Sequence, residues 1–205
     1  MTLRKEQYEA LRDWFDGYVE SFRGIPALGP WVELKECHTR RVTGIIVRIG
    51  SSLGLPEEDL FLARTIALLH DVGRFRQIQR YGTFNDRRSE NHALSGVAVL
   101  RQAGALDGLA AGEAGLVLRA VERHNLRELP PDPDPRFSLF ARLVQDADKL
   151  DILDMFTRYY GGEDAGLGGV LDVHLPDTPG MSAALVEDVL QGKLGNYSDL
   201  TSSHG

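Results

Sequence analysis

Apolar residues recur every three or four positions along most of the chain, which is the spacing of one face of an α-helix. In residues 4–22, for example, Leu11, Phe15 and Phe22 fall on such a face. The same spacing predicts helices over residues 32–50, 60–69, 90–103, 113–124, 137–160 and 182–191. Only residues 170–175 alternate like a strand, and one short strand cannot form a sheet by itself. The chain is therefore predicted to be an all-α bundle of about six to eight helices.

Glycine, proline and charged residues interrupt the apolar pattern and predict the connections between helices. The predicted loops and turns cover residues 24–30, 53–59, 74–90, 130–135 and 161–169, followed by a frayed tail from residue 196. Gly73 is expected to let the chain turn away from the helix that ends at His70. Ser89 is expected to cap the next helix, and Cys37 is expected to face inward as a small buried residue.

Length and composition are those of one globular domain. The chain has 205 residues, of which 42% are hydrophobic and 26% charged, so it is long enough for one core and too apolar for disorder. We expect a single domain over residues 1–205, with a core at about 30–160, an N-terminal helix and a C-terminal extension. The net charge of -7 disfavours a long nucleic acid as partner. No membrane span or signal peptide is recognisable, and with a single cysteine this favours the cytoplasm.

The candidate chemistry begins with the adjacent residues His70 and Asp71, at the end of an apolar helix. An imidazole nitrogen and a carboxylate oxygen can share one divalent metal ion, but two ligands cannot hold such an ion in water. Asp148 lies among apolar residues of a predicted helix, where an unpaired buried carboxylate would cost several kcal/mol. The competing carboxylate is Asp146, which points about 160° away from Asp148 on a helix.

Four of the six histidines fall on or at the ends of different predicted helices, where a bundle can point them inward. These four are His38, His70, His92 and His124. The alternative roles are structural, because His92 can pair with Glu90 and His124 can act as a cation at the C-terminus of a helix. His174 and His204 lie outside this pattern and are expected to be exposed.

The ordered set His38, His70-Asp71 and Asp148 resembles the HD superfamily of metal-dependent phosphohydrolases, and Asp148 lies in the Ala-Asp-Lys-Leu segment that many members have there. The resemblance covers about residues 30–160 and implies an HD-domain helical bundle. Branches with two more histidines hold two metal ions, bridged by the aspartate of the His-Asp pair. By that resemblance, His38, His70, Asp71 and Asp148 bind the first ion, and Asp71, His92 and His124 bind the second.

The resemblance thus implies one or two divalent ions of Mn, Fe, Co, Ni, Mg or Zn as cofactor. The Gly-Tyr-Pro signature of the cyclic-di-nucleotide phosphodiesterase branch is missing from the chain, so that substrate is not assigned.

Five arginines between residues 74 and 88 are notable in an acidic protein. Their segment joins the His-Asp pair to His92, so it is expected to pass near the site. Arginine binds phosphate through two parallel hydrogen bonds, which makes Arg74, Arg76 and Arg88 candidates for binding substrate phosphate, the alternative being a solvated loop. The candidate catalytic residues are Asp71, Arg74 and Lys149, of which Lys149 would hold phosphate or pair with Asp71.

The leading functional hypothesis is hydrolysis of a phosphoester of a nucleotide or small phosphorylated metabolite by metal-activated water. The resemblance leaves two alternatives, a mixed-valent di-iron oxygenase with the same order of ligands and a non-catalytic nucleotide-sensing domain. A small phosphorylated substrate is the expected partner, with no long nucleic acid and no membrane. The sequence does not define the oligomeric state.

Overall fold

The protein is described by a computed structural model that covers residues 3–162, 179–193 and 195. Every regular element in these ranges is a helix, so the predicted all-α class is confirmed. The chain divides into two compact units, residues 1–157 and residues 158–205. The stretch 170–175, the tail from residue 196, most of the loop 161–169, His174 and His204 lie outside the described residues.

Most helices begin and end within three residues of the bounds that the apolar spacing predicts. The α-helices are α1 (Lys5–Arg23), α2 (Gly29–Ser52), α3 (Glu57–Leu69), α4 (Val72–Tyr81), α5 (His92–Gln102), α6 (Ala111–Arg123), α7 (Pro135–Tyr160) and α8 (Ala183–Leu190). Two short 3-10 helices, η1 (Pro26–Leu28) and η2 (Asp86–Arg88), lie in the connections. Within the described ranges, no helix combines the length and apolar character needed to cross a lipid bilayer.

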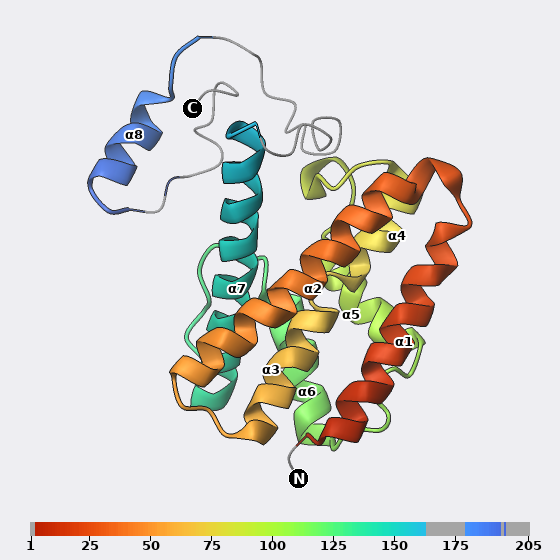
Figure 1. The fold of residues 1–205 in the computed structure, drawn as a ribbon. Helices are drawn as coiled ribbons and strands as arrows, with labels where there is room; N and C mark the ends of the chain where they lie inside the picture. Colours follow the sequence, from red (N-terminus) through yellow and green to blue (C-terminus); the bar gives the residue numbers. More distant parts are fainter. Residues whose placement is uncertain (1–2, 163–178, 194, 196–205) are drawn as a thin grey trace. The chain divides into compact units, whose positions relative to one another are not determined.

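Helix α3 is the central element of the first unit and packs against α1, α2 and α6 (Figure 1). Its residues Leu62, Ile66 and Leu69 have no exposed surface. Burial of a large aliphatic side chain contributes about 1.5–3 kcal/mol, so this helix is held firmly by its neighbours. The residue that follows it, His70, is therefore fixed at a defined depth in the bundle.

Helix α4 corrects the prediction of a polar loop from residue 74. Val72, Phe75 and Ile78 are buried at helical spacing, while the arginines between them hid this apolar face in the sequence. The helix ends at Gly82, whose positive φ of 65° places it in the left-handed region that glycine tolerates best.

Two smaller predictions on local structure are also wrong. Asn91, not Ser89, caps α5, because its side chain accepts hydrogen bonds from the backbone N–H groups of Ala93 and Leu94. Cys37 is exposed, because the inward face of α2 is that of its neighbour His38 and of Val42.

Gly73 is not the turn residue that the sequence suggested. The break between α3 and α4 falls at Asp71, whose φ of -105° and ψ of 14° are not helical. Gly73 lies inside α4, and its missing side chain lets α4 approach α5 closely. A Cβ atom at this position would lie 2.1 Å from the carbonyl oxygen of His92 and 2.6 Å from the amide nitrogen of Gly96. Only glycine fits such a backbone contact.

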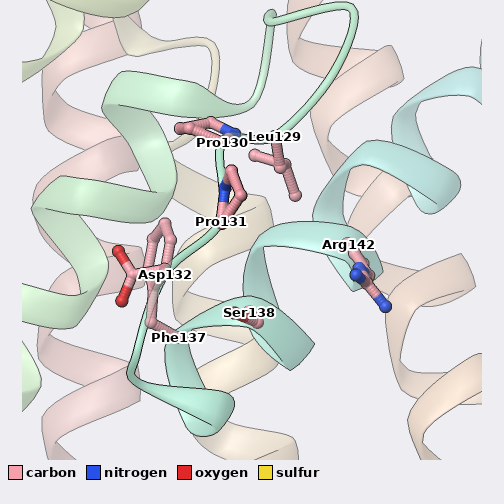
Figure 2. A pocket seen from close by; sticks show the side chains of 7 residues that line it. All are labelled: Leu129, Pro130, Pro131, Asp132, Phe137, Ser138 and Arg142. Atoms are coloured by element: carbon pink, nitrogen blue, oxygen red, sulfur yellow. The ribbon is translucent and has the colours of Figure 1, made fainter.

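A surface hollow lies between the loop that follows α6 and the first turns of α7 (Figure 2). Leu129, Pro130 and Pro131 of the loop line it together with Phe137 and Arg142 of α7. None of the predicted site residues lines this hollow, so it is separate from the candidate chemistry.

Candidate metal centre

The six predicted metal ligands come from separate parts of the first unit and meet in its interior. His70 directly follows α3 and Asp71 directly precedes α4, so both occupy the junction of two helices. The others are His38 within α2, His92 at the start of α5, His124 directly after α6 and Asp148 within α7. The four histidines and Asp71 are at most 3% exposed, and the side chain of Asp148 is 18% exposed. The centre is therefore largely closed to solvent.

The carboxylate of Asp71 lies between two pairs of imidazoles. Its Oδ2 atom is 3.6 Å from Nε2 of His38 and 3.7 Å from Nε2 of His70. Its Oδ1 atom is 3.4 Å from Nε2 of His92 and 3.6 Å from Nε2 of His124. Each oxygen thus faces its own pair of nitrogens, and each set of three buried residues can hold one metal ion.

Asp148 joins the first of these two groups. Its Oδ1 atom lies 3.0 Å from Nε2 of His38 and 3.8 Å from Nε2 of His70. The first group therefore has two carboxylates and two imidazoles, and the second has the shared Asp71 and two imidazoles. Such mixed nitrogen and oxygen donors suit divalent transition metals.

Two of the imidazoles are oriented by backbone carbonyl groups of their own helices. Nδ1 of His70 is 2.7 Å from the carbonyl oxygen of Ala67, and Nδ1 of His124 is 2.7 Å from that of Val121. A carbonyl oxygen only accepts hydrogen bonds, so Nδ1 carries the proton in both rings. Their Nε2 atoms consequently present lone pairs towards Asp71.

The other two imidazoles are oriented by carboxylates. Nδ1 of His38 lies 2.7 Å from Oδ2 of Asp151, and Nδ1 of His92 lies 2.7 Å from Oδ2 of Asp86. A carboxylate that accepts the Nδ1–H group fixes the ring and raises the basicity of Nε2, which is the usual support of a metal-binding histidine.

The donor atoms of the centre fit a metal ion better than they fit one another. Nε2 of His92 and Nε2 of His124 face each other at 3.0 Å, although both Nδ1 atoms are already hydrogen-bonded elsewhere. Nε2 of His38 and of His70 are buried without a hydrogen-bond partner. Buried lone pairs without partners are costly, and one cation in each group would satisfy the two nitrogens of that group.

Electrostatics in the first group favour a positive charge. Burial raises the pKa of Asp71, but Lys35 and His70 outweigh it and hold this pKa well below its usual value. The ammonium group of Lys35 lies 2.8 Å from Oδ2 of Asp71. Burial and Lys35 lower the pKa of His38, yet Asp148 and Asp151 outweigh them and raise it above its usual value. A pocket that stabilises cationic His38 also attracts a metal ion.

Asp86 is the hub of a polar network beside the second group. Its Oδ1 atom accepts hydrogen bonds from Arg74 at 2.9 Å and from Gln77 at 2.8 Å, while its carboxylate also holds His92. Burial raises the pKa of Asp86, but His92 and Arg74 lower it to about 2. Burial and Arg74 lower the pKa of His92 to about 4, so its imidazole is neutral at pH 7 and available as a ligand.

The structure places the predicted phosphate-binding and catalytic cations at different distances from the centre. Nε of Arg74 lies 3.5 Å from Oδ1 of Asp71, and its NH1 group also binds the carbonyl oxygen of Phe84. Arg76 donates to Gln102 at the end of α5, and Arg88 and Lys149 are exposed. Lys35, rather than Lys149, forms the ion pair with Asp71.

Sequence reasoning missed three charged residues that contact the ligands. These are Lys35, Asp86 and Asp151. Lys35 precedes His38 by three residues and Asp151 follows Asp148 by three, so helical spacing to a predicted ligand would have found both. Asp151 is held in turn by Arg41, whose Nε atom donates to Oδ1 at 2.6 Å. Asp86 carries no such signal, since it lies between α4 and α5.

An all-α fold with two buried groups of histidine and aspartate that share one carboxylate defines a metal-binding helical protein. The HD domain family matches residues 36–153, which is more than half of the chain. The chain therefore belongs to the HD domain family, as the sequence resemblance implies. Searches among curated proteins and among solved structures found no match.

Proposed function

We propose that the protein is a metal-dependent phosphohydrolase that cleaves a phosphoester of a nucleotide or a small phosphorylated metabolite. The observation that carries this proposal is the position of Asp71, whose two carboxylate oxygens each face a separate pair of imidazole nitrogens. A shared carboxylate of this kind would hold one ion on each of its oxygens. Paired metal ions stabilise both the attacking and the leaving oxygen of a phosphoester displacement.

In this proposal His38, His70, Asp71 and Asp148 hold one ion and Asp71, His92 and His124 hold the other. When bound, divalent ions supply an activated water molecule and neutralise charge on the phosphoryl oxygens. Lys35 donates a hydrogen bond to Asp71 at 2.8 Å, so its ammonium group is close enough to bind a phosphoryl oxygen beside the ions.

Arg74 has a positioning role in the same proposal. Its side chain reaches Asp71 and Asp86 together, so it links the shared carboxylate to the residue that orients His92. Arg74 therefore positions the centre, and Lys35 is the cation that this proposal assigns to the substrate phosphate.

The proposal is tested with metal-depleted protein that is reloaded with Mn²⁺, Co²⁺ or Fe²⁺ and incubated with a panel of phosphoesters. We expect metal-dependent release of phosphate or of a nucleoside from at least one compound. Asp148→Ala is expected to abolish this activity and to weaken binding of the first ion. Asp146→Ala is the matched control, because Asp146 lies on the same helix with an exposed side chain.

Three results would replace the proposal. Inactivity across the panel with two bound ions per chain would refute phosphoester hydrolysis. Substrate-dependent uptake of O₂ by iron-loaded protein, with a mixed-valence EPR signal, would identify an oxygenase. Absence of turnover by the unchanged protein, together with nucleotide binding that survives Asp71→Ala, would identify a sensing domain.

A further inference from the structure

A pair of partly exposed aromatic rings lies next to the metal centre. Trp31 belongs to the first turn of α2, and Phe84 lies between α4 and η2. Their ring centroids are 5.3 Å apart and their planes are inclined by 77°, an edge-to-face arrangement. Such a contact uses one face of one ring and the edge of the other, so Phe84 covers at most one face of the Trp31 ring.

The register of α2 connects these rings to the metal ligands. Trp31, Lys35 and His38 follow one another at intervals of four and three residues, so they lie on one face of the helix. Seven residues of α-helix correspond to about 10 Å along the axis. This face therefore presents, in order, an aromatic ring, an ammonium group and a metal-ligating imidazole.

Cations connect Phe84 to the same centre. Nζ of Lys35 lies 5.4 Å from the centroid of the Phe84 ring, and the guanidinium carbon of Arg74 lies 5.7 Å from it. Both side chains also reach Asp71. The positive charges thus lie between the aromatic pair and the carboxylate that the two groups of histidines share.

We propose that Trp31 and Phe84 are specificity-determining residues that bind a planar ring of the substrate, while its phosphate lies beside Lys35 and the metal ligands. This inference rests on the proposed function and narrows it to phosphoesters in which a spacer separates the ring from the phosphate. A nucleoside monophosphate has that order of phosphate, sugar and base. Any nucleobase can stack on an aromatic side chain, since every base has a π face.

The competing explanation is structural, because the contact of Trp31 with Phe84 also fastens the segment between α4 and η2 to α2. The two explanations differ in what they predict for different ligands. A fastening role affects every phosphoester equally, because the segment carries Asp86 and so supports His92. A ring-binding role affects only ligands that carry a ring.

The test uses tryptophan fluorescence, since Trp14 and Trp31 are the two tryptophans of the chain. Trp14 stacks on Tyr18 within α1, so Trp14→Phe leaves Trp31 as the single reporter with little change to the metal centre. Adenosine 5′-monophosphate and ribose 5-phosphate are titrated into this variant loaded with Zn²⁺. We expect saturable quenching by the nucleotide and little or none by the sugar phosphate.

Calorimetry of the metal-loaded full-length protein gives the second measurement. Trp31→Ala is expected to weaken binding of adenosine 5′-monophosphate by about 5- to 150-fold, the range for losing one stacked base, and to change binding of ribose 5-phosphate less than about twofold. Trp31→Phe is expected to retain most of the affinity. Circular dichroism establishes that each variant is folded.

The inference is overturned if both ligands bind equally well to the unchanged protein, or if Trp31→Ala weakens both equally. In either case hydrolysis of sugar phosphates with full metal occupancy would leave the proposed function standing. If Trp31 supported selective nucleotide binding but no phosphoester were hydrolysed, the ring-binding inference would hold and the phosphohydrolase proposal would fail.

Discussion

Replacement of Gly73 by alanine should damage the second metal group without touching any ligand. A Cβ atom at Gly73 would lie 2.1 Å from the carbonyl oxygen of His92, whereas carbon and oxygen atoms in ordinary close contact are about 3.3 Å apart. The two atoms nearest to this Cβ, the carbonyl oxygen of His92 and the amide nitrogen of Gly96, belong to the backbone, so no side chain can rotate away. Helix α5 must therefore shift by about 1 Å, and His92, its first residue, shifts with it.

Overpacking of this kind costs about 1–3 kcal/mol, and occasionally more. The better helix propensity of alanine returns up to about 1 kcal/mol of that cost. In a chain of this size, 1 kcal/mol corresponds to about 2–4 °C in Tm, so we expect the Tm of metal-free Gly73→Ala to fall by several degrees. Binding of the second ion should weaken by at least tenfold, because small displacements of a ligand act like the loss of its support.

The assay combines thermal unfolding followed by circular dichroism with calorimetric titration of metal ions. Gly96→Ala is a matched control on the facing helix, because its Cβ atom would come no closer than 3.4 Å to any neighbour. Gly17→Ala tests helix propensity alone, because a Cβ atom there meets nothing within 4 Å, and it should stabilise the protein by up to about 1 kcal/mol. Unchanged stability and two bound ions in Gly73→Ala would refute the close-packing argument.

Other predictions concern the residues that support the ligands. Asp86→Ala should weaken binding of the second ion by about 10- to 100-fold, and Asp151→Ala should weaken binding of the first ion by the same factor. Calorimetric titration of metal ions measures both effects. If either change weakened both ions equally, the assignment of Asp86 to the second group and of Asp151 to the first would be wrong. The pKa of Asp86 is lowered to about 2, so this carboxylate stabilises the fold above about pH 4 and loses that effect as the pH falls towards 2. Urea unfolding between pH 2 and 5 should therefore show that Asp86→Asn loses less stability with falling pH than the unchanged protein. Identical pH profiles of the two proteins would contradict this role of Asp86. Mn²⁺ at about 100 times its Kd should raise the free energy of unfolding by about 2.7 kcal/mol per ion, and Asp71→Ala should abolish this gain.

The sequence was sufficient to predict every described α-helix except α4, and to select the six candidate ligands that the structure brings together. Long apolar periods define helices such as α3 by themselves, and imidazoles or carboxylates inside such periods need a reason to be there. The sequence was insufficient for α4, where arginines alternate with the buried residues Val72, Phe75 and Ile78 and mask their spacing. The charges on the exposed face of α4 therefore hid the burial of its apolar face.

The supporting residues were harder to predict for a different reason. Asp86 and Gly73 act through contacts between separate helices, and such contacts depend on how α4, α5 and α6 pack rather than on any local pattern. Lys149 lies directly beside a predicted ligand in the sequence, whereas Lys35 lies three residues before His38. Adjacent positions on a helix point in different directions, so neighbours three residues away are the better candidates.

The way the four imidazoles are held has a consequence for how the centre fills. Each group combines one ring backed by a carboxylate with one backed by a peptide carbonyl, so the two groups match in nitrogen donors. Only the group around His38 has an additional anionic oxygen, that of Asp148. At limiting metal concentration, the first equivalent of metal ion should therefore bind beside His38. The second equivalent should bind beside His92 only after that position is filled. A reaction that needs both ions would then rise with metal concentration after a lag, and its onset would report the filling of the weaker position.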